Sequence, residues 1–214
     1  MIKLQSFLVR RDDMTHEAFR DYWLTEHVPI ARELPGLRCY RTAVPVDPDR
    51  SRYDGIAELY FDTVAAFEAV LGPDSDTEAM RDVPNFERTS DRCLVTETVH
   101  RDDLGDRTRT PKLVAIVHRS PELSREAFHD RWVDALRPGE VPSLRKVTTA
   151  VPLEPDEADY DGVVELYADD VDALEAAVFP AGAGGEATLP LDDGLVGRVD
   201  GHLVEEIVQV GFDG

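Results

Sequence analysis

Lysine is almost absent from this 214-residue chain and occurs only as Lys3, Lys112 and Lys146. Cysteine is as scarce, and the wide separation of Cys39 and Cys93 suggests neither a disulfide framework nor a zinc motif. No apolar run approaches the ~18 residues that a membrane span needs, and the N-terminal segment lacks the layout of a secretory signal. We therefore expect a cytoplasmic protein with no metal site and no membrane partner.

The charge balance is strongly acidic, with 44 Asp and Glu residues against 23 Lys and Arg residues and a net charge of −21. Such a charge repels phosphates, so we expect no nucleic-acid partner. An Asp-rich, Lys-poor composition is typical of proteins from salt-accumulating halophiles, in which salt screens the repulsion. The alternative is an acidic docking surface for a basic partner, although the acids are spread through both halves of the chain.

The chain contains the same pattern twice. The segment that begins at Lys3 aligns without a gap with the segment that begins at Lys112, and eight of 21 positions are identical. A second block from Tyr53 matches one from Tyr160, with 11 of 17 positions identical. Repetition on this scale indicates one structural unit in each half. The expected organisation is a first unit at residues 1–102, a polar linker at 103–111 and a degenerate second unit at 112–214.

Each copy shows the element order β-α-β-β-α-β of a split βαβ unit. Alternating apolar residues indicate strands, and Thr15 and Ser124 are N-cap residues that begin helices. In the first copy the strands are expected at residues 2–10, 37–46, 53–61 and 92–101, with helices after Thr15 and at 63–71. In the second copy the elements are expected, in order, at residues 112–119, 124–135, 143–152, 160–168, 170–178 and 199–209.

The strand sequences indicate that both faces of each sheet are covered. In the first strand, Leu4 and Leu8 share one face, and Phe7 and Val9 share the other. The helices of one ferredoxin-like unit cover only one face of its sheet, so a second sheet is the natural cover for the other face. The sequence therefore predicts an α+β fold in which two ferredoxin-like units form a dimeric α/β barrel within one chain.

Four segments resemble the EthD-like family of dimeric α/β-barrel proteins. They are KLQSFLVRR from Lys3, THEAFRDYWLTEHVPIARELPGLRCY from Thr15, YDGIAELYFDT from Tyr53 and VTETV from Val95. The resemblance covers residues 1–101 well and a second copy at 110–210 more weakly. It implies that two units, which are usually separate chains in that family, form a pseudo-dimer here, and it leaves a further homodimer open.

The resemblance makes His27 the leading catalytic candidate, because Trp23, His27 and Pro29 match the family's Trp-x-x-x-His-x-Pro pattern. A histidine with a pKa near ~6.5 suits general acid–base catalysis. Pro29 also predicts a break or kink in the helix just after His27. The alternative is a half-buried histidine that bonds a backbone carbonyl. The aligned residue of the second copy is Leu136, so we expect one working site and one decayed site.

Asp54 and Glu58 are a second candidate catalytic set. Their spacing on a strand puts both carboxylates on one face about 13 Å apart, so each needs another partner. The second copy keeps equivalent acids although it lacks the histidine, which favours a structural role instead. The expected pocket lies between the first sheet and its first helix, and the residues expected to line it for the substrate are Phe7, Tyr22, Trp23 and Tyr60.

The leading functional interpretation is a cofactor-independent lyase, isomerase or cyclase that acts on a small apolar organic molecule by histidine acid–base catalysis. No glycine-rich phosphate loop or serine nucleophile elbow occurs, so we expect no nucleotide cofactor. The resemblance leaves two alternatives: a non-catalytic small-molecule binding or stress protein, and a haem-binding barrel like distant relatives.

The acidic composition predicts a salt-dependent stability. The melting temperature should rise as KCl is increased from low to molar concentration, because salt screens the repulsion among the carboxylates. Thermal unfolding followed by circular dichroism at several KCl concentrations measures this. A melting temperature that does not change with salt would favour the acidic docking surface.

Overall fold

The computed structural model describes residues 1–132, 143–178, 189 and 194–212. The strands in these residues are β1 (Ile2–Arg10), β2 (Leu37–Pro45), β3 (Gly55–Phe61), β4 (Glu87–Asp102), β5 (Arg109–Arg119), β6 (Lys146–Pro152), β7 (Gly162–Tyr167) and β8 (Val196–Val210). Their hydrogen-bonding order β1-β3-β2-β8-β5-β7-β6-β4 closes on itself, so the fold is the antiparallel α/β barrel that the sequence predicts. No helix among the described residues is long and apolar enough to cross a membrane.

The chain divides by its contacts into two compact units, residues 1–95 with 206–214 and residues 96–205. The strands β4 and β8 each contribute residues to both units. The repeat boundaries 1–102 and 112–214 remain a prediction, because contacts divide a chain by packing and not by repetition. Within the expected linker, residues 109–111 already belong to β5.

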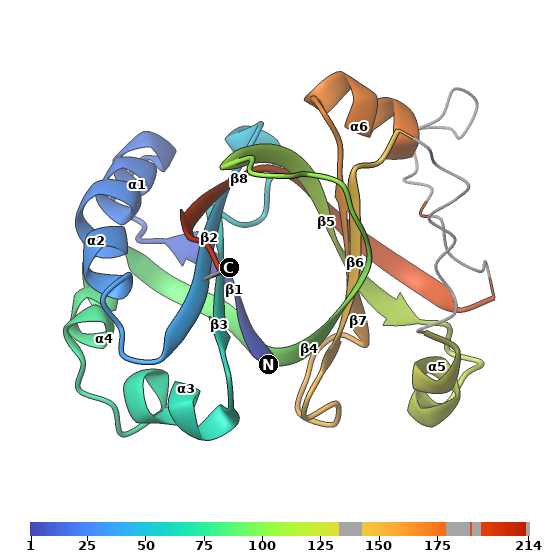
Figure 1. Ribbon diagram of the computed structural model, residues 1–214, viewed down its shortest axis with the longest axis horizontal. Helices are drawn as coiled ribbons and strands as arrows, with labels where there is room; N and C mark the ends of the chain where they lie inside the picture. The colour runs from blue at the N-terminus through green and yellow to red at the C-terminus, as the bar shows by residue number, and fades with distance from the viewer. Residues whose placement is uncertain (133–142, 179–188, 190–193, 213–214) are drawn as a thin grey trace. The chain divides into compact units, whose positions relative to one another are not determined.

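The helical segment of the first unit begins where the sequence predicts. Thr15 caps it, because the Thr15 hydroxyl accepts a hydrogen bond from the Ala18 amide at 3.1 Å. Helices α1 (His16–Tyr22) and α2 (Val28–Ala31) are joined by the π-helical turn η1 (Trp23–His27). In Figure 1 this segment runs beside β1, β2 and β3.

The expected break after His27 does not occur, because Val28 keeps helical backbone angles and α2 follows directly. The helix instead widens to a π turn before Pro29, in which the Val28 amide bonds the carbonyl of Trp23 five residues back. Proline has no amide hydrogen to donate, and π turns are a common way to absorb such an irregularity. The π turn sets the direction in which Trp23 and His27 project.

The segment after the third strand contains helices that the sequence did not predict. The expected helix is present as α3 (Val64–Leu71), and it is followed by α4 (Glu78–Asp82) and the 3-10 turn η3 (Val83–Asn85). The hydroxyl of Thr77 caps α4 by accepting a hydrogen bond from the Met80 amide at 3.4 Å. A further 3-10 turn, η2 (Pro48–Arg50), lies between β2 and β3.

The strand register sorts the side chains of the first unit onto two buried faces. On one face Leu4 of β1 pairs with Leu59 of β3, and Ser6 pairs with Ala57. On the other face Gln5 pairs with Glu58. Because successive side chains of a strand point to opposite faces, the apolar set and the polar set cannot mix. The helices α1 to α4 lie over the apolar face.

The second unit shows the same element order, with α5 (Arg125–Trp132) and α6 (Val171–Val178). Ser124 caps α5, because its hydroxyl accepts a hydrogen bond from the Ala127 amide at 3.1 Å. The sequence predicts this helix at 124–135, and residues 133–135 of that range lie outside the described part of the chain, as does Leu136. Buried apolar side chains, with Phe128 and Trp132 among them, fill the space between the helices and the strands.

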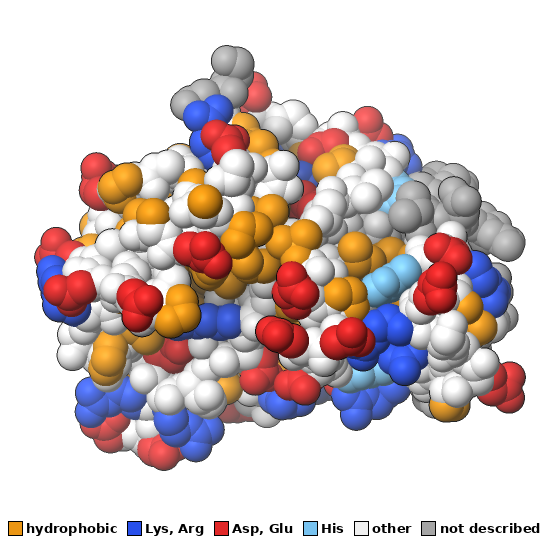
Figure 2. All heavy atoms as spheres, turned by 90° about the horizontal axis from the view of Figure 1, so that it is seen from below, with side chains coloured by type: hydrophobic (Ala, Val, Ile, Leu, Met, Phe, Trp, Pro, Cys, Tyr) orange, Lys and Arg blue, Asp and Glu red, His pale blue; other side chains and the backbone are white. Residues whose placement is uncertain are grey.

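The three lysines lie in the interior, each with 4% or less of its surface exposed. Lys3 lies 3.8 Å from Glu58, and Lys112 lies 3.7 Å from Glu165 in the second unit. The cations on the surface are therefore arginines. In Figure 2 acidic side chains are scattered across the visible face rather than gathered in one patch.

Each unit has a tryptophan packed against a strand glycine. A Cβ atom at Gly55 would lie 2.5 Å from the Trp23 ring, and one at Gly162 would lie 2.6 Å from the Trp132 ring. No side chain fits in that distance, so the close approach of the tryptophan ring requires glycine at both positions. The backbone φ angle of these two residues does not require it. The contact fixes the distance between the first helix of each unit and its third strand.

A Gly55→Ala substitution should therefore lower the free energy of unfolding by about 1–3 kcal/mol, because the added methyl group overpacks the Trp23 ring. Gly211→Ala is the matched control, since a Cβ there would meet no atom within 4 Å. Urea unfolding of both variants measures the difference. Equal stability of the Gly55→Ala variant and the unchanged protein would contradict this packing.

Candidate active site

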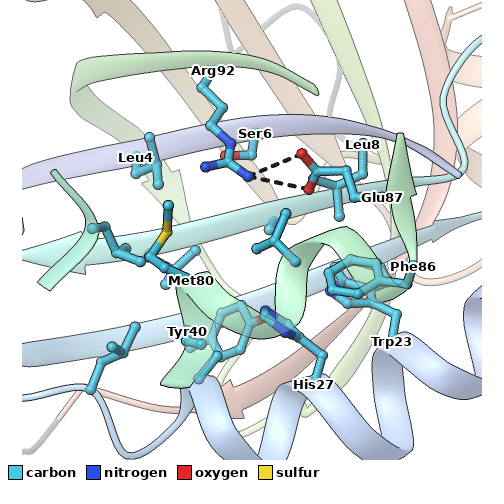
Figure 3. Close-up of a pocket in the computed structure, with 17 residues that line it drawn as sticks. Leu4, Ser6, Leu8, Trp23, His27, Tyr40, Met80, Phe86, Glu87 and Arg92 are labelled. Carbon is cyan, nitrogen blue, oxygen red and sulfur yellow. Dashed lines mark hydrogen bonds and ion pairs between the residues drawn. The ribbon is translucent and has the colours of Figure 1, made fainter. Parts of the chain in front are cut away.

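A pocket lies between the helices of the first unit and the apolar face of its sheet. Leu4, Ser6 and Leu8 of β1 form one side, and His27 is among the residues that line it. Figure 3 shows these β1 side chains across from Trp23, His27 and Tyr40. The cavity volume, counted as the space open to the centre of a water molecule, is about 50 Å³, several times the ~10–15 Å³ that one water needs on the same measure. The pocket therefore has room for a small organic molecule.

His27 is held at this pocket by a carboxylate. Its Nδ1 lies 2.9 Å from Oδ2 of Asp82, at the end of α4. The ring packs on Phe86, with 4.6 Å between the ring centres. The side chain of His27 is about nine-tenths buried. The sequence left open a hydrogen bond from His27 to a backbone carbonyl. At Nδ1 the partner is the Asp82 carboxylate instead.

Asp82 is itself fixed by two further donors. Its Oδ1 accepts hydrogen bonds from the Tyr22 hydroxyl at 2.8 Å and from Asn85 Nδ2 at 2.9 Å. Burial raises the pKa of Asp82, but the hydrogen bonds from Asn85, Tyr22 and His27 outweigh it, and the net pKa is below the ordinary value. Asp82 is therefore ionised at neutral pH and can only accept hydrogen bonds.

The protonation of His27 follows from that carboxylate. Burial lowers the pKa of His27 below its ordinary 6.5, although the hydrogen bond to Asp82 acts in the opposite direction. The ring is neutral at pH 7, and its Nδ1 must carry the hydrogen because Asp82 can only accept. The other ring nitrogen, Nε2, then holds a lone pair and is available as a base.

The opposite side of the pocket carries a second charged pair. Arg92 Nη2 donates to both oxygens of Glu87, at 3.0 and 3.2 Å, and Arg92 Nε donates to the Ser90 hydroxyl at 2.8 Å. Glu87 and Arg92 both line the pocket, and both contribute to the electrostatic environment of His27. Figure 3 shows the pair beside Ser6 and Leu8, across from His27.

The structure brings together only part of the expected pocket. Trp23 and His27 line it, and Tyr22 contacts it indirectly through Asp82. Phe7 and Tyr60 do not line it, because they lie on the opposite face of the sheet from Leu4 and Ser6. Placing them under the helix was wrong, since the alternation of β1 and β3 directs them away from it.

Asp54 and Glu58 also lie outside this pocket. Asp54 accepts hydrogen bonds from the backbone amide of Arg10 at 2.9 Å and from its guanidinium at 2.8 Å, and its Oδ1 lies 2.6 Å from His16. Asp161 of the second unit is bound by Arg119 in the same way. This recurrence gives Asp54 a structural role, which ties the end of β1 to the start of β3.

Reasoning from the sequence did not identify Asp82, Glu87 and Arg92 as site residues. A usable signal was present, because Ala79, Met80, Val83 and Phe86 recur at helical spacing after the N-cap residue Thr77. All four of these apolar residues line the pocket.

The polar lining is not repeated in the second half of the chain. The positions aligned with Ser6 and Tyr40 are Ala115 and Val147, both part of the buried apolar cluster. The positions aligned with Glu87 and Arg92 are Val196 and Gly201. The position aligned with His27 lies outside the described residues. Where the first unit has polar pocket walls, the second therefore has apolar packing.

Within the described residues, no group of three or more His, Cys, Asp or Glu side chains is placed to hold a metal ion. The side chains at the pocket supply a histidine base, a carboxylate that orients it, and an arginine on the opposite wall.

Comparison with protein families finds a match within the first half of the chain. Residues 11–90 match the family model of the EthD domain. The matched segment is similar to that domain. It contains His27, Asp82 and Glu87, and it spans less than half of the chain. Comparison with curated proteins found no match.

Solved structures match nearly the whole chain at low identity. An anthrone oxidase-like protein superposes with a TM-score of 0.65 at 13% identity, over 97% of this chain and 90% of its own. A provisionally named monooxygenase from Fusobacterium nucleatum gives 0.61 at 9% identity, over 100% and 95%. A provisionally named chlorite dismutase gives 0.51 at 13%, over 97% and 94%. These likenesses show a shared fold.

The environment of His27 predicts its titration. NMR should find its pKa below 6.5, and Asp82→Asn should lower it further by removing a bond and a charge that favour the imidazolium. Between the folded pKa and 6.5 the unfolded chain binds more protons, so this group lowers the stability as pH falls through that range. A pKa above 6.5 would contradict burial as the dominant cause, and a rise of the pKa in Asp82→Asn would contradict the stabilisation of the imidazolium by Asp82.

Proposed function

We propose that the first unit is an enzyme site that moves a proton on a small, largely apolar organic molecule, with His27 as the base and then the acid. The observation that carries this proposal is the His27–Asp82 contact at the edge of a mostly apolar cavity. The reaction class is a lyase, isomerase or cyclase reaction that needs no cofactor for the proton transfer itself.

The geometry gives a separate role to each of four side chains. Asp82 holds the Nδ1–H of His27, which leaves Nε2 as the base and stabilises the imidazolium that forms when it takes a proton. Tyr22 and Asn85 hold Asp82 in turn. They act as positioning residues, because they reach the reacting nitrogen only through Asp82.

The comparisons support a role in small-molecule chemistry. The EthD domain match covers the segment that contains His27 and Asp82. Two of the similar structures are named as an oxidase-like protein and a monooxygenase. Those names describe enzymes, and the shared fold is compatible with an enzyme role for this chain.

Two other roles make different demands on the pocket. A non-catalytic binding protein would use the cavity without needing a neutral, oriented histidine. A haem protein would need a space wide enough for a flat macrocycle. An absorbance spectrum of the concentrated protein tests for haem directly.

The proton-transfer proposal can be tested with 5-nitrobenzisoxazole, a small apolar reporter of base catalysis. The base removes the C3 proton, the electron pair completes a nitrile, and the N–O bond breaks to give a coloured phenolate. His27→Ala should lower the second-order rate constant on the order of a hundredfold, which is the usual contribution of a general base.

The controls separate catalysis from structure. His118→Ala removes a partly exposed histidine of the second unit and should react like the unchanged protein. Asp82→Asn should reduce the rate and move the pH profile to lower pH, since the pKa of His27 falls. If His27→Ala reacts as fast as the His118→Ala control, the pocket is not a proton-transfer site.

A further inference from the structure

Arg92 has donor capacity that the protein leaves unused. One terminal nitrogen, Nη2, binds Glu87, and Nε binds Ser90. The other terminal nitrogen, Nη1, has no hydrogen-bond partner among the described residues. Figure 3 shows it turned away from Glu87, on the side of Leu4. The Arg92 side chain is one-third exposed, and Arg92 is among the residues that line the pocket.

The position of this donor is fixed by the sheet. Arg92 lies directly opposite Ser6 in the pairing of β4 with β1, and both residues line the pocket. Glu87 is about 94% buried and holds the guanidinium through two bonds. Because the charge of Glu87 offsets that of Arg92, this side of the pocket has little general attraction for anions. It instead offers a hydrogen-bond donor with a fixed direction.

The walls between Arg92 and His27 are mainly apolar. They include Leu4, Leu59 and Met80. A fitting ligand therefore has an apolar body, one acceptor oxygen that faces Arg92 and a carbon-bound hydrogen that faces His27. A neutral carbonyl compound with a hydrogen on the adjacent carbon has all three features.

We propose that the pocket selects small neutral carbonyl compounds, with Arg92 binding the carbonyl oxygen while His27 takes a proton from the adjacent carbon. This inference rests on the proposed function and adds the substrate class to it. The second half of the chain supports it, because Val196 and Gly201 stand where the pocket has Glu87 and Arg92. The pair of Glu87 and Arg92 is present in the unit that has His27, and it is absent from the aligned positions of the second half.

The chemical step balances without another reactant. His27 Nε2 takes the proton, the C–H electron pair forms a carbon–carbon double bond, and the carbonyl π pair moves onto oxygen. Arg92 stabilises the enolate oxygen through its N–H groups. Return of a proton from His27 to the same carbon restores the compound. Where a carbon–carbon double bond is conjugated with the enolate, return of the proton to the far end of that double bond gives an isomer.

The experiment uses cyclopentanone and methylenecyclopentane, which replaces the oxygen by CH₂. Ligand-observed NMR measures the affinity of the full-length protein for each, and proton NMR in D₂O measures deuterium exchange next to the carbonyl. The unchanged protein should prefer the ketone by about tenfold or more, the usual effect of a hydrogen bond to a charged group. It should also accelerate the exchange.

The matched variant is Glu87→Val with Arg92→Gly, which installs the residues of the second half and leaves no buried charge unpaired. It should lose both the preference and the exchange. Arg92→Lys keeps a charge beside Glu87 without the forked donor, and it should lose most of the preference. It serves as the test if the double variant does not fold.

The outcomes separate this inference from the proposed function. Loss of exchange in both His27→Ala and the Arg92 variants supports both. If His27→Ala abolishes exchange while the Arg92 variants keep the tenfold preference, the assignment of the carbonyl oxygen to Arg92 is wrong and proton transfer stands. If the unchanged protein shows neither preference nor exchange but still acts on the isoxazole through His27, the substrate class is overturned alone. If His27→Ala changes nothing in either assay, the proposed function falls.

Discussion

The two-residue period of the strands is the constraint on which the pocket depends. In β1 it sends Leu4, Ser6 and Leu8 towards the helices and Lys3 and Gln5 to the opposite face. The first set meets a helical segment whose spacing is set by Trp23 against Gly55. The second set surrounds Glu58 with polar partners. An apolar cavity and a buried charged cluster can therefore lie on either side of one thin sheet without sharing residues.

The two halves share the contacts that hold the fold together, so the side chains in which they differ indicate what is particular to the first pocket. Trp132 packs on Gly162 as Trp23 packs on Gly55, and Asp161 is bound by arginine as Asp54 is. These shared contacts account for the residues that both halves retain. The side chains that differ are those that give the first pocket its chemistry. Asp54 has a counterpart in the second half, although His27 does not. Its hydrogen bonds with the backbone amide and the guanidinium of Arg10 explain why both halves have this carboxylate.

The sequence predicted the barrel because strand alternation, N-caps and the repeated blocks all indicated the same order of elements. It located Trp23 and His27 through a resemblance, and both line the pocket. It missed Asp82 because α4 is a short helix in a segment without a counterpart in the aligned blocks. It also placed Tyr60 in the pocket, although alternation along β3 puts it on the other face. Partners that come from distant segments, such as Asp82 for His27, have no local signature that could reveal the pairing.

The central claim is that the first unit holds a working pocket beside His27. Diffraction from crystals soaked with 5-nitroindazole tests it most directly, since this molecule has the shape of the isoxazole but no bond that breaks on loss of a proton. The account predicts electron density for the molecule between His27 and the β1 side chains Leu4 and Ser6. Density found only elsewhere on the chain, with this cavity unchanged, would contradict the claim.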